Sequence, residues 1–115
     1  NNLNMVIYNV SDLASEHKGE YVLGLEDLHT HACYLIYGFM KPGEKGRVLK
    51  PGSGHEEIVC LVQGKVLLSN SSGRFVLDQG QAFHLKGDET YLMDNEAGTD
   101  AVYMISGGHS KGHGH

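Results

Sequence analysis

A glutamate with apolar residues at the alternate positions after it stands at the start of one of the most apolar stretches of this chain. Glu57 lies in the segment PGSGHEEIVCLVQG, residues 51–64, and its neighbours at alternate positions, Val59 and Leu61, are apolar. Residues two apart on a strand face the same side, so Glu57 is expected to face the interior with them. A buried carboxylate needs a metal ion, a basic side chain or a proton. Glu57 is therefore the first candidate for a binding residue, and a solvated strand start is the alternative. The basic partners to be considered are Arg47, Arg74, Lys50 and Lys86.

Histidines are numerous enough to supply metal ligands, with eight in 115 residues. His55 lies two residues before Glu57, so both side chains share a face if the strand extends that far. His29 and His31 form an H-x-H pair, whose imidazoles would lie about 7 Å apart on a strand, close enough for one ion. One hypothesis is a divalent metal (Fe, Mn, Zn or Ni) held by these three histidines and Glu57. The alternative for each histidine is an exposed turn or strand end.

Other side chains could complete a site for a small molecule. His84 lies between Phe83 and Leu85, the expected core residues of its strand, and should face away from them. Several tyrosines could line a cavity and bind a polar ligand through their hydroxyls, or could pack in the core. These tyrosines are Tyr34, Tyr37, Tyr91 and Tyr103.

Short apolar runs separated by turn residues predict an all-β fold. About eight strands are expected at the 8- to 12-residue spacing of a sandwich or jelly roll, among them residues 31–40, residues 56–64 and a hairpin that turns at 70–73. Residues 56–64 are apolar on both faces, so a second sheet or a second subunit should cover the outer one.

The chain is expected to form one domain with short segments at both ends. Residues 1–29 would hold an edge strand at 5–10 and a helical turn capped by Ser11, and a barrel would follow over residues 30–108. Residues 109–115 contain glycine and histidine without an apolar anchor, and we expect them to form a mobile tail.

The segment around Glu57 resembles the first signature of the cupin superfamily, G-x5-H-x-H-x3-E-x6-G. Glu57 and Gly64 match its final E-x6-G, whereas Pro51 and Ser53 stand where it has histidines. Proline cannot coordinate through its side chain, and serine is a poor ligand for soft or borderline divalent metals. Only Glu57 is carried over as a ligand.

The second cupin signature, G-x5-P-x-G-x2-H-x3-N, is similar to GQAFHLKGDETYLMDN. Gly80 and Asn95 match its ends, whereas Lys86 stands at its proline, Asp88 at its second glycine and Tyr91 at its histidine. The resemblance covers about residues 30–106. It implies a cupin-like jelly-roll β-barrel, commonly dimeric, with a metal inside on three histidines and one glutamate, and here that metal centre is degenerate.

Three functions follow from the resemblance and the candidate residues. The first is a small-molecule-binding protein or enzyme of unassigned substrate, with a pocket around Glu57, His55, Tyr91 and Tyr37. The second is a metal-dependent enzyme of the dioxygenase or isomerase type, in which Tyr91 or His84 would handle a proton. The third resembles metal-free sugar-nucleotide epimerases and requires a facing His and Tyr with a clamp of Arg and Lys.

The composition limits which binding partners and which cellular location are expected for this chain. A formal net charge of −5 argues against nucleic acid, which needs clustered Lys and Arg. No apolar run is long enough for a membrane span, and no secretory signal is visible. Cys33 and Cys60, each in an apolar run, fit buried free thiols of a reducing compartment, although a disulfide between them is the alternative. We therefore expect a cytoplasmic homodimer that binds a small molecule.

Overall fold

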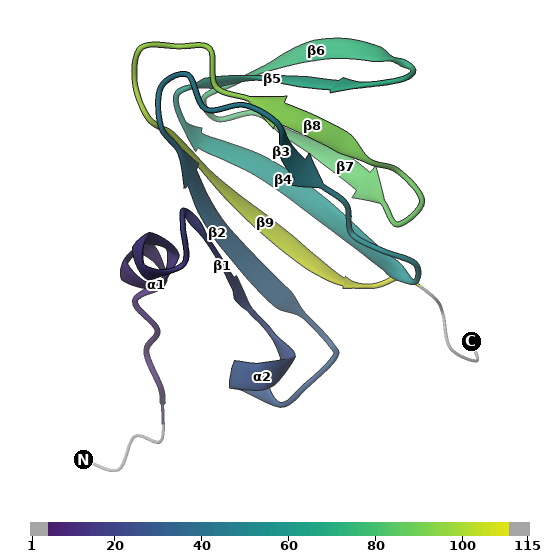
Figure 1. The fold of residues 1–115 in the computed structure, drawn as a ribbon. Coiled ribbons are helices and arrows are strands. Elements are labelled where there is room, and N and C mark those ends of the chain that lie inside the picture. Colours follow the sequence, from purple (N-terminus) through teal and green to yellow (C-terminus); the bar gives the residue numbers. More distant parts are fainter. Residues whose placement is uncertain (1–4, 111–115) are drawn as a thin grey trace.

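Two antiparallel sheets pack face to face in the computed structural model, which describes residues 5–110 (Figure 1). The larger sheet has the strand order β1-β2-β9-β4-β7, and the smaller has the order β3-β8-β5-β6. Consecutive strands often lie in different sheets, as in a jelly roll. The predicted all-β, jelly-roll fold is confirmed.

The elements are short and follow one another closely. The strands are β1 (Glu20–Leu23), β2 (Tyr34–Met40), β3 (Arg47–Leu49), β4 (His55–Gln63), β5 (Lys65–Asn70), β6 (Gly73–Asp78), β7 (Ala82–Lys86), β8 (Tyr91–Asp94) and β9 (Ala101–His109), and the helices are α1 (Val10–Glu16) and α2 (Leu25–Leu28). The helices lie beside β1 and β2, at one side of the larger sheet (Figure 1).

The core lies between the two sheets and is supplied by alternate residues of each strand. On β4, Glu57, Val59 and Leu61 are buried, whereas Ile58 and Val62 are 53% and 46% exposed. This period of two places Glu57 on the inner face, as predicted. The outer face of β4 is apolar but is not covered within residues 5–110.

Two residues matched to the cupin signatures have structural roles. Gly64 has φ +92°, and a Cβ there would come within 2.9 Å of the carbonyl oxygen of Asp100. Asn95 is fully buried, and its side-chain amide donates to the carbonyl oxygens of Met40 at 3.0 Å and Thr99 at 2.9 Å. Both residues shape loops and carry no binding chemistry.

The amino-terminal part differs from the expectation. The strand expected at 5–10 is not formed, because residues 5–9 are irregular and α1 begins at Val10. The helix was predicted, but Asn9 rather than Ser11 caps it, since the Asn9 side chain accepts from the backbone N–H of Asp12. Alternating apolar residues at 5–10 were thus a misleading strand signal.

Several strand ends also differ from those expected. The strand predicted from residue 31 begins at Tyr34, and β9 continues to His109 instead of ending before the predicted tail. The remainder of that tail, residues 111–115 with His113 and His115, lies outside the described residues. Both cysteines are free, but Cys33 is exposed rather than buried.

A network of polar contacts links β1 to its neighbours in the barrel. The Tyr103 ring on β9 lies over Gly38 of β2, and its hydroxyl donates to the carboxylate of Glu20 on β1. Arg47 donates to that hydroxyl at 3.0 Å and to Glu44 at 2.6 Å. These contacts join β1, β2, β3 and β9.

Candidate functional site

Three residues on adjacent strands form a row across the inner face of the larger sheet. Tyr34 of β2 is paired with Gly107 of β9, and Gly107 is paired with Glu57 of β4. A Cβ at Gly107 would overlap the ring of Tyr34, so the glycine lets that ring lie across β9. The Tyr34 hydroxyl thereby reaches Glu57 and donates to its Oε2 at 2.6 Å.

The row holds two acidic groups with altered proton affinity. Glu57 is only 5% exposed, and burial raises the pKa of its carboxyl, although the hydrogen bond from Tyr34 opposes this. Burial, followed by the bond to Glu57, raises the pKa of the Tyr34 hydroxyl. Tyr34 therefore remains a hydrogen-bond donor, and Glu57 is the group whose protonation a ligand can change.

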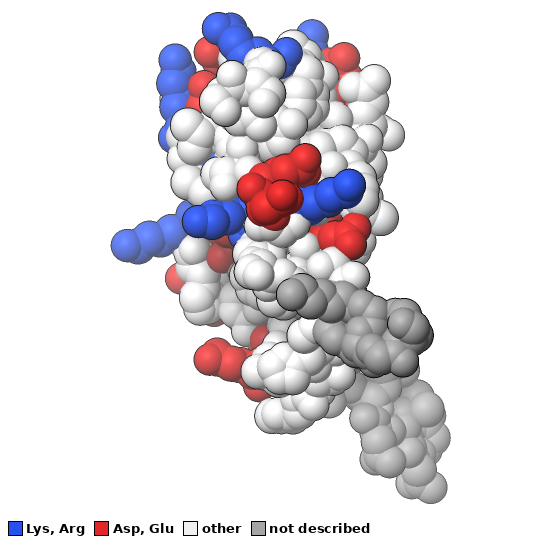
Figure 2. All heavy atoms as spheres, turned by 90° about the vertical axis from the view of Figure 1, so that its right-hand side faces the viewer, with Lys and Arg blue, Asp and Glu red and all other residues white. Residues whose placement is uncertain are grey.

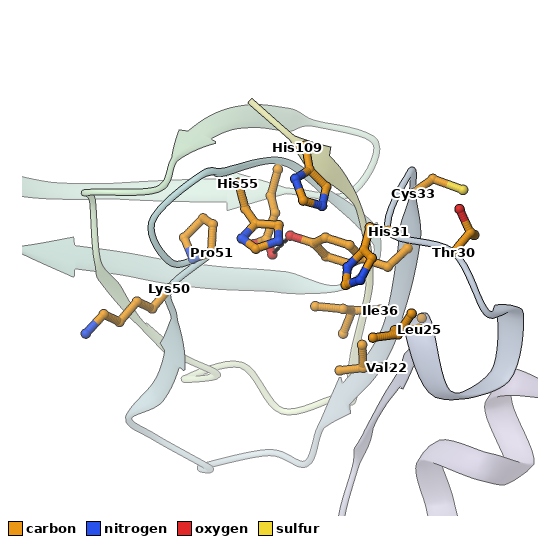
Figure 3. A pocket seen from close by; sticks show the side chains of 13 residues that line it. Val22, Leu25, Thr30, His31, Cys33, Ile36, Lys50, Pro51, His55 and His109 are labelled. Atoms are coloured by element: carbon orange, nitrogen blue, oxygen red, sulfur yellow. Dashed lines mark hydrogen bonds between the residues drawn. The ribbon is translucent and has the colours of Figure 1, made fainter. Parts of the chain in front are cut away.

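This row borders an open pocket of about 300 Å³ (Figure 3). Val22, Leu25 and Ile36 form an apolar side, while the polar groups gather opposite them. The full lining is Val22, Gly24, Leu25, Thr30, His31, Cys33, Tyr34, Ile36, Lys50, Pro51, His55, Glu57 and His109. The pocket thus combines an apolar wall with a buried carboxylate.

Three imidazoles surround the polar side of the pocket (Figure 3). His55 begins β4, His109 ends β9, and His31 lies in the loop before β2. The ring centroids of His55 and His109 are 5.1 Å apart, and those of His31 and His109 are 5.6 Å apart. The ring of His55 also contacts that of Tyr34, with centroids 5.9 Å apart.

The structure brings some of the predicted site residues together and not others. Glu57, His55 and His31 line one pocket. His29 does not join them, because it caps the carboxyl end of α2 with φ 59°. The predicted H-x-H strand pair is therefore wrong: residues 29–33 do not form a strand.

The remaining candidates lie away from this pocket. Tyr91 packs its ring against Phe75 and Phe83, with centroids 5.6 Å away in each case. His84 lies on the outer face, as expected, and its Nε2 is 2.6 Å from Oε1 of Glu56. Tyr37 alternates with the inward-facing residues of β2 and so faces outward.

The partner of Glu57 is a hydroxyl rather than one of the basic residues considered from the sequence. Arg47 is bound to Glu44 and Tyr103, and Lys50 extends away from the histidine rings (Figure 3). Among residues 5–110, Lys50 is also the only Lys or Arg that lines this pocket. The epimerase hypothesis finds a facing Tyr and His in Tyr34 and His55, but not the clamp of basic residues.

The usual cupin metal position does not fit the residues present. Pro51 lines the pocket without a donor, Ser53 is exposed, and Tyr91 lies in the aromatic cluster. Within residues 5–110, no three or more His, Cys, Asp or Glu side chains are arranged as a ready metal site. The side chains at these positions therefore do not supply the ligand set of the usual cupin metal site.

Two members of the site were missed from the sequence, namely Gly107 and His109. From the sequence, Tyr34 is expected only as one of several tyrosines that could line a cavity. The available signal was a repeated Y-x3-G pattern, YLIYG at 34–38 and YMISG at 103–107. In the antiparallel pair β2–β9, each tyrosine lies over the glycine of the other segment.

Charges on the surface are mixed, and the described part contains no membrane helix. Lys and Arg side chains lie next to Asp and Glu on the face shown in Figure 2. No helix within residues 5–110 has the length and apolar character required to cross a membrane.

Solved structures with the same fold are found at low sequence identity. They include a cupin domain of an XRE-family transcriptional regulator from Enterobacter cloacae, with 16% identity, a TM-score of 0.65, and coverage of 81% of this chain and 99% of that one. A cupin protein from Bacteroides fragilis has 12% identity and a TM-score of 0.70, covering 96% and 86%. A sugar phosphate isomerase of the cupin superfamily from Silicibacter pomeroyi has 19% identity and a TM-score of 0.61, covering 91% and 68%.

These likenesses show that the chain has the cupin fold, as its resemblance to the two signatures predicted. The neighbours include both an enzyme and part of a regulator, so the fold alone selects no activity. No protein-family model matches the sequence, and no curated protein matches it.

Proposed function

We propose that this chain binds a small organic molecule in the pocket beside Glu57 and Tyr34. The observation that supports this proposal is a carboxylate that is 5% exposed, hydrogen-bonded to a tyrosine, and still part of the lining of an open pocket. A carboxylate buried only for stability would be costly, because it must be desolvated. A ligand that donates a hydrogen bond to Glu57 would offset that cost.

The lining indicates the chemistry of the ligand. Val22, Leu25 and Ile36 offer an apolar surface, and Glu57 accepts hydrogen bonds at the opposite side. The best fit is a molecule with an apolar part and at least one hydroxyl or amine group. A chain with two free cysteines is suited to such a role in the cytoplasm.

A thermal-shift screen of small hydroxylated and amine-bearing metabolites tests this proposal. A ligand at 100 times its Kd adds about 2.7 kcal/mol to the stability of the folded state. Compounds that stabilise the wild type should lose that effect in Glu57→Gln and Tyr34→Phe. The same compounds should still stabilise the control Tyr91→Phe, whose ring lies away from the pocket and packs against Phe83. Equal stabilisation of all four proteins would contradict the proposal.

We also propose that two copies associate through the outer face of the larger sheet. Ile58 and Val62 are about half exposed there, and Cys60 lies between them on the same face. Alternating strands normally place polar residues on a solvated face. The same face of a second copy supplies an apolar surface of equal extent, as a two-fold dimer requires.

Light scattering after gel filtration tests this association. The wild type should have the mass of a dimer, and the double variant Ile58→Glu/Val62→Glu should have that of a monomer. Val76→Glu is the matched control, because Val76 is 51% exposed on the smaller sheet. A monomeric wild type would rule out the dimer.

A further inference from the structure

A second row on the inner face of the larger sheet repeats the arrangement of the row beside the pocket. Tyr103 of β9 is paired with Gly38 of β2, and Gly38 is paired with Glu20 of β1. A Cβ at Gly38 would overlap the ring of Tyr103, and the Tyr103 hydroxyl donates to the carboxylate of Glu20. The strands β2 and β9 therefore carry the same tyrosine–carboxylate contact twice, each time across a glycine.

The second row contains its own cation. The guanidinium of Arg47 donates to the Tyr103 hydroxyl at 3.0 Å and lies over the Tyr103 ring, 5.9 Å from its centroid. Arg47 also forms an ion pair with Glu44 at 2.6 Å. Because Tyr103 is fully buried, this row is closed, and the chain itself supplies the positive charge beside the tyrosine–carboxylate contact.

The row beside the pocket differs from the closed row in this one component. In the part of the chain that the structure describes, only Lys50 brings a basic side chain to the pocket wall, and its amine is directed away from the histidine rings (Figure 3). The contact between Tyr34 and Glu57 borders an open pocket of about 300 Å³ instead. One row thus has a guanidinium from the chain, and the other has a cavity.

We propose that the ligand of this pocket carries a cationic nitrogen, an ammonium or guanidinium group, which binds beside Tyr34 and Glu57 as Arg47 binds beside Tyr103. The inference rests on the proposed function and narrows its ligand class to organic cations. A charged donor forms a shorter and stronger hydrogen bond with a carboxylate than a neutral donor does. A cation over the face of a tyrosine ring is also attracted by that ring.

The charges around Glu57 favour a cation in the pocket. Burial is the main cause of the raised pKa of Glu57, and the negative charge of Glu20 adds to it, whereas the hydrogen bond from Tyr34 and the charge of His55 oppose it. A bound cation would counter the effects of burial and of Glu20, because an opposite charge nearby stabilises a carboxylate. The carbon part of the ligand would lie against the apolar side of the pocket.

Matched pairs of an amine and an alcohol test the charge of the ligand. Benzylamine and benzyl alcohol, and likewise isoamylamine and isoamyl alcohol, have the same apolar part and nearly the same size. NMR titrations of the full chain, followed through the amide signals of Tyr34, Glu57 and Gly107, give the Kd of each compound. At about pH 8, alkylamines are charged and a histidine in a model peptide is neutral. We expect each amine to bind at least about tenfold more tightly than its alcohol, and benzoate to bind more weakly than benzyl alcohol.

Two glutamine variants assign the preference to one carboxylate. In Glu57→Gln, the amines should bind no more tightly than the alcohols. Glu56→Gln is the matched control, because it removes the same charge one position away, on the outer face, where Glu56 contacts His84. This control should keep the preference for amines. An equal loss in both variants would overturn the inference, since it would mean that the net charge of the protein and not Glu57 attracts the amines.

The inference and the proposed function can be told apart by these titrations. Alcohols that bind through Glu57 as tightly as the matched amines would overturn the inference and leave the proposed function standing. If no compound of the thermal-shift screen and neither amine binds at this row, the proposed function fails as well. The comparison of amine with alcohol uses the wild type, so it decides the inference even if Glu57→Gln does not fold.

Discussion

The hydroxyl of Tyr34 lies 2.6 Å from Oε2 of Glu57, although the two residues belong to strands that are not neighbours. Between them runs β9, where Gly107 leaves room for the tyrosine ring. The contact requires a tyrosine, a glycine and a glutamate to lie side by side on three neighbouring strands. The proposed ligand site depends on this row and on the pocket beside it.

Removal of the Tyr34 hydroxyl should destabilise the protein at neutral pH. A hydrogen bond to a charged group contributes about 1.5–3 kcal/mol, so we expect a loss of that order in Tyr34→Phe. Urea unfolding followed by circular dichroism measures it. Tyr91→Phe is the control, since that ring contributes by packing against Phe75 and Phe83. Equal losses in both variants would contradict a special role for the Tyr34 hydroxyl.

A side chain at Gly107 should break the row without removing either polar group. The Cβ of Gly107→Ala would overlap the Tyr34 ring and displace it from Glu57. We expect a cost of about 1–3 kcal/mol from overpacking, together with weaker ligand binding. Gly98→Ala is a matched control because a Cβ there meets no atom within 4 Å. If Gly107→Ala unfolds at the same urea concentration as the wild type, the close packing of Tyr34 on Gly107 is wrong.

Burial raises the pKa of Glu57, and this makes stability depend on pH. The folded state holds the proton at higher pH than the unfolded chain, whose glutamates titrate near pH 4.3. The stabilising contribution is complete below the unfolded pKa and is lost as pH rises through the folded pKa. In EDTA, the free energy of unfolding of the wild type relative to Glu57→Gln should therefore fall as the pH rises above about 4. A difference that rises with pH would mean that the pKa is lowered instead.

Arg47, which lies outside the pocket, should be important for the stability of the folded protein. Its guanidinium is largely buried and donates to the carbonyl oxygens of Phe39 at 2.7 Å and Gly19 at 3.1 Å. Arg47→Ala should cost about 3 kcal/mol, because it leaves these two carbonyl oxygens without their donor and removes the ion pair with Glu44. Arg74→Ala, at an exposed position, should change stability by less than about 0.5 kcal/mol. Similar melting temperatures for the two variants would contradict this account.

The fold could be predicted from local patterns because its strands alternate clearly. The apolar residues Val59 and Leu61 predicted the inner face of β4, and the turn residues at 70–73 predicted the hairpin of β5 and β6. Asn95 and Gly64 were recognised by spacing, and both prove to hold loops in place. The apolar residues at 5–10 gave the wrong element, since alternation over so short a stretch does not exclude a loop leading into a helix.

The site was harder to predict because it depends on register between distant strands. Glu57 and His55 were identified, but the partner of Glu57 lies 23 residues away on β2. His109 was assigned to a tail because glycine-rich residues precede it, whereas Gly107 is needed there for the Tyr34 ring. Tyr91 was favoured by its position in the cupin signature, which gives no information about the direction of its ring.

Backbone amide shifts in two-dimensional NMR test the central claim most directly. A compound that stabilises the protein in the thermal screen should shift the amide signals of Tyr34, Glu57 and Gly107 in the wild type. Those shifts should disappear in Glu57→Gln at the same compound concentration. Shifts confined to the hollow formed by residues 69–72 and 88–92, or shifts that persist unchanged in Glu57→Gln, would contradict a binding site at this row.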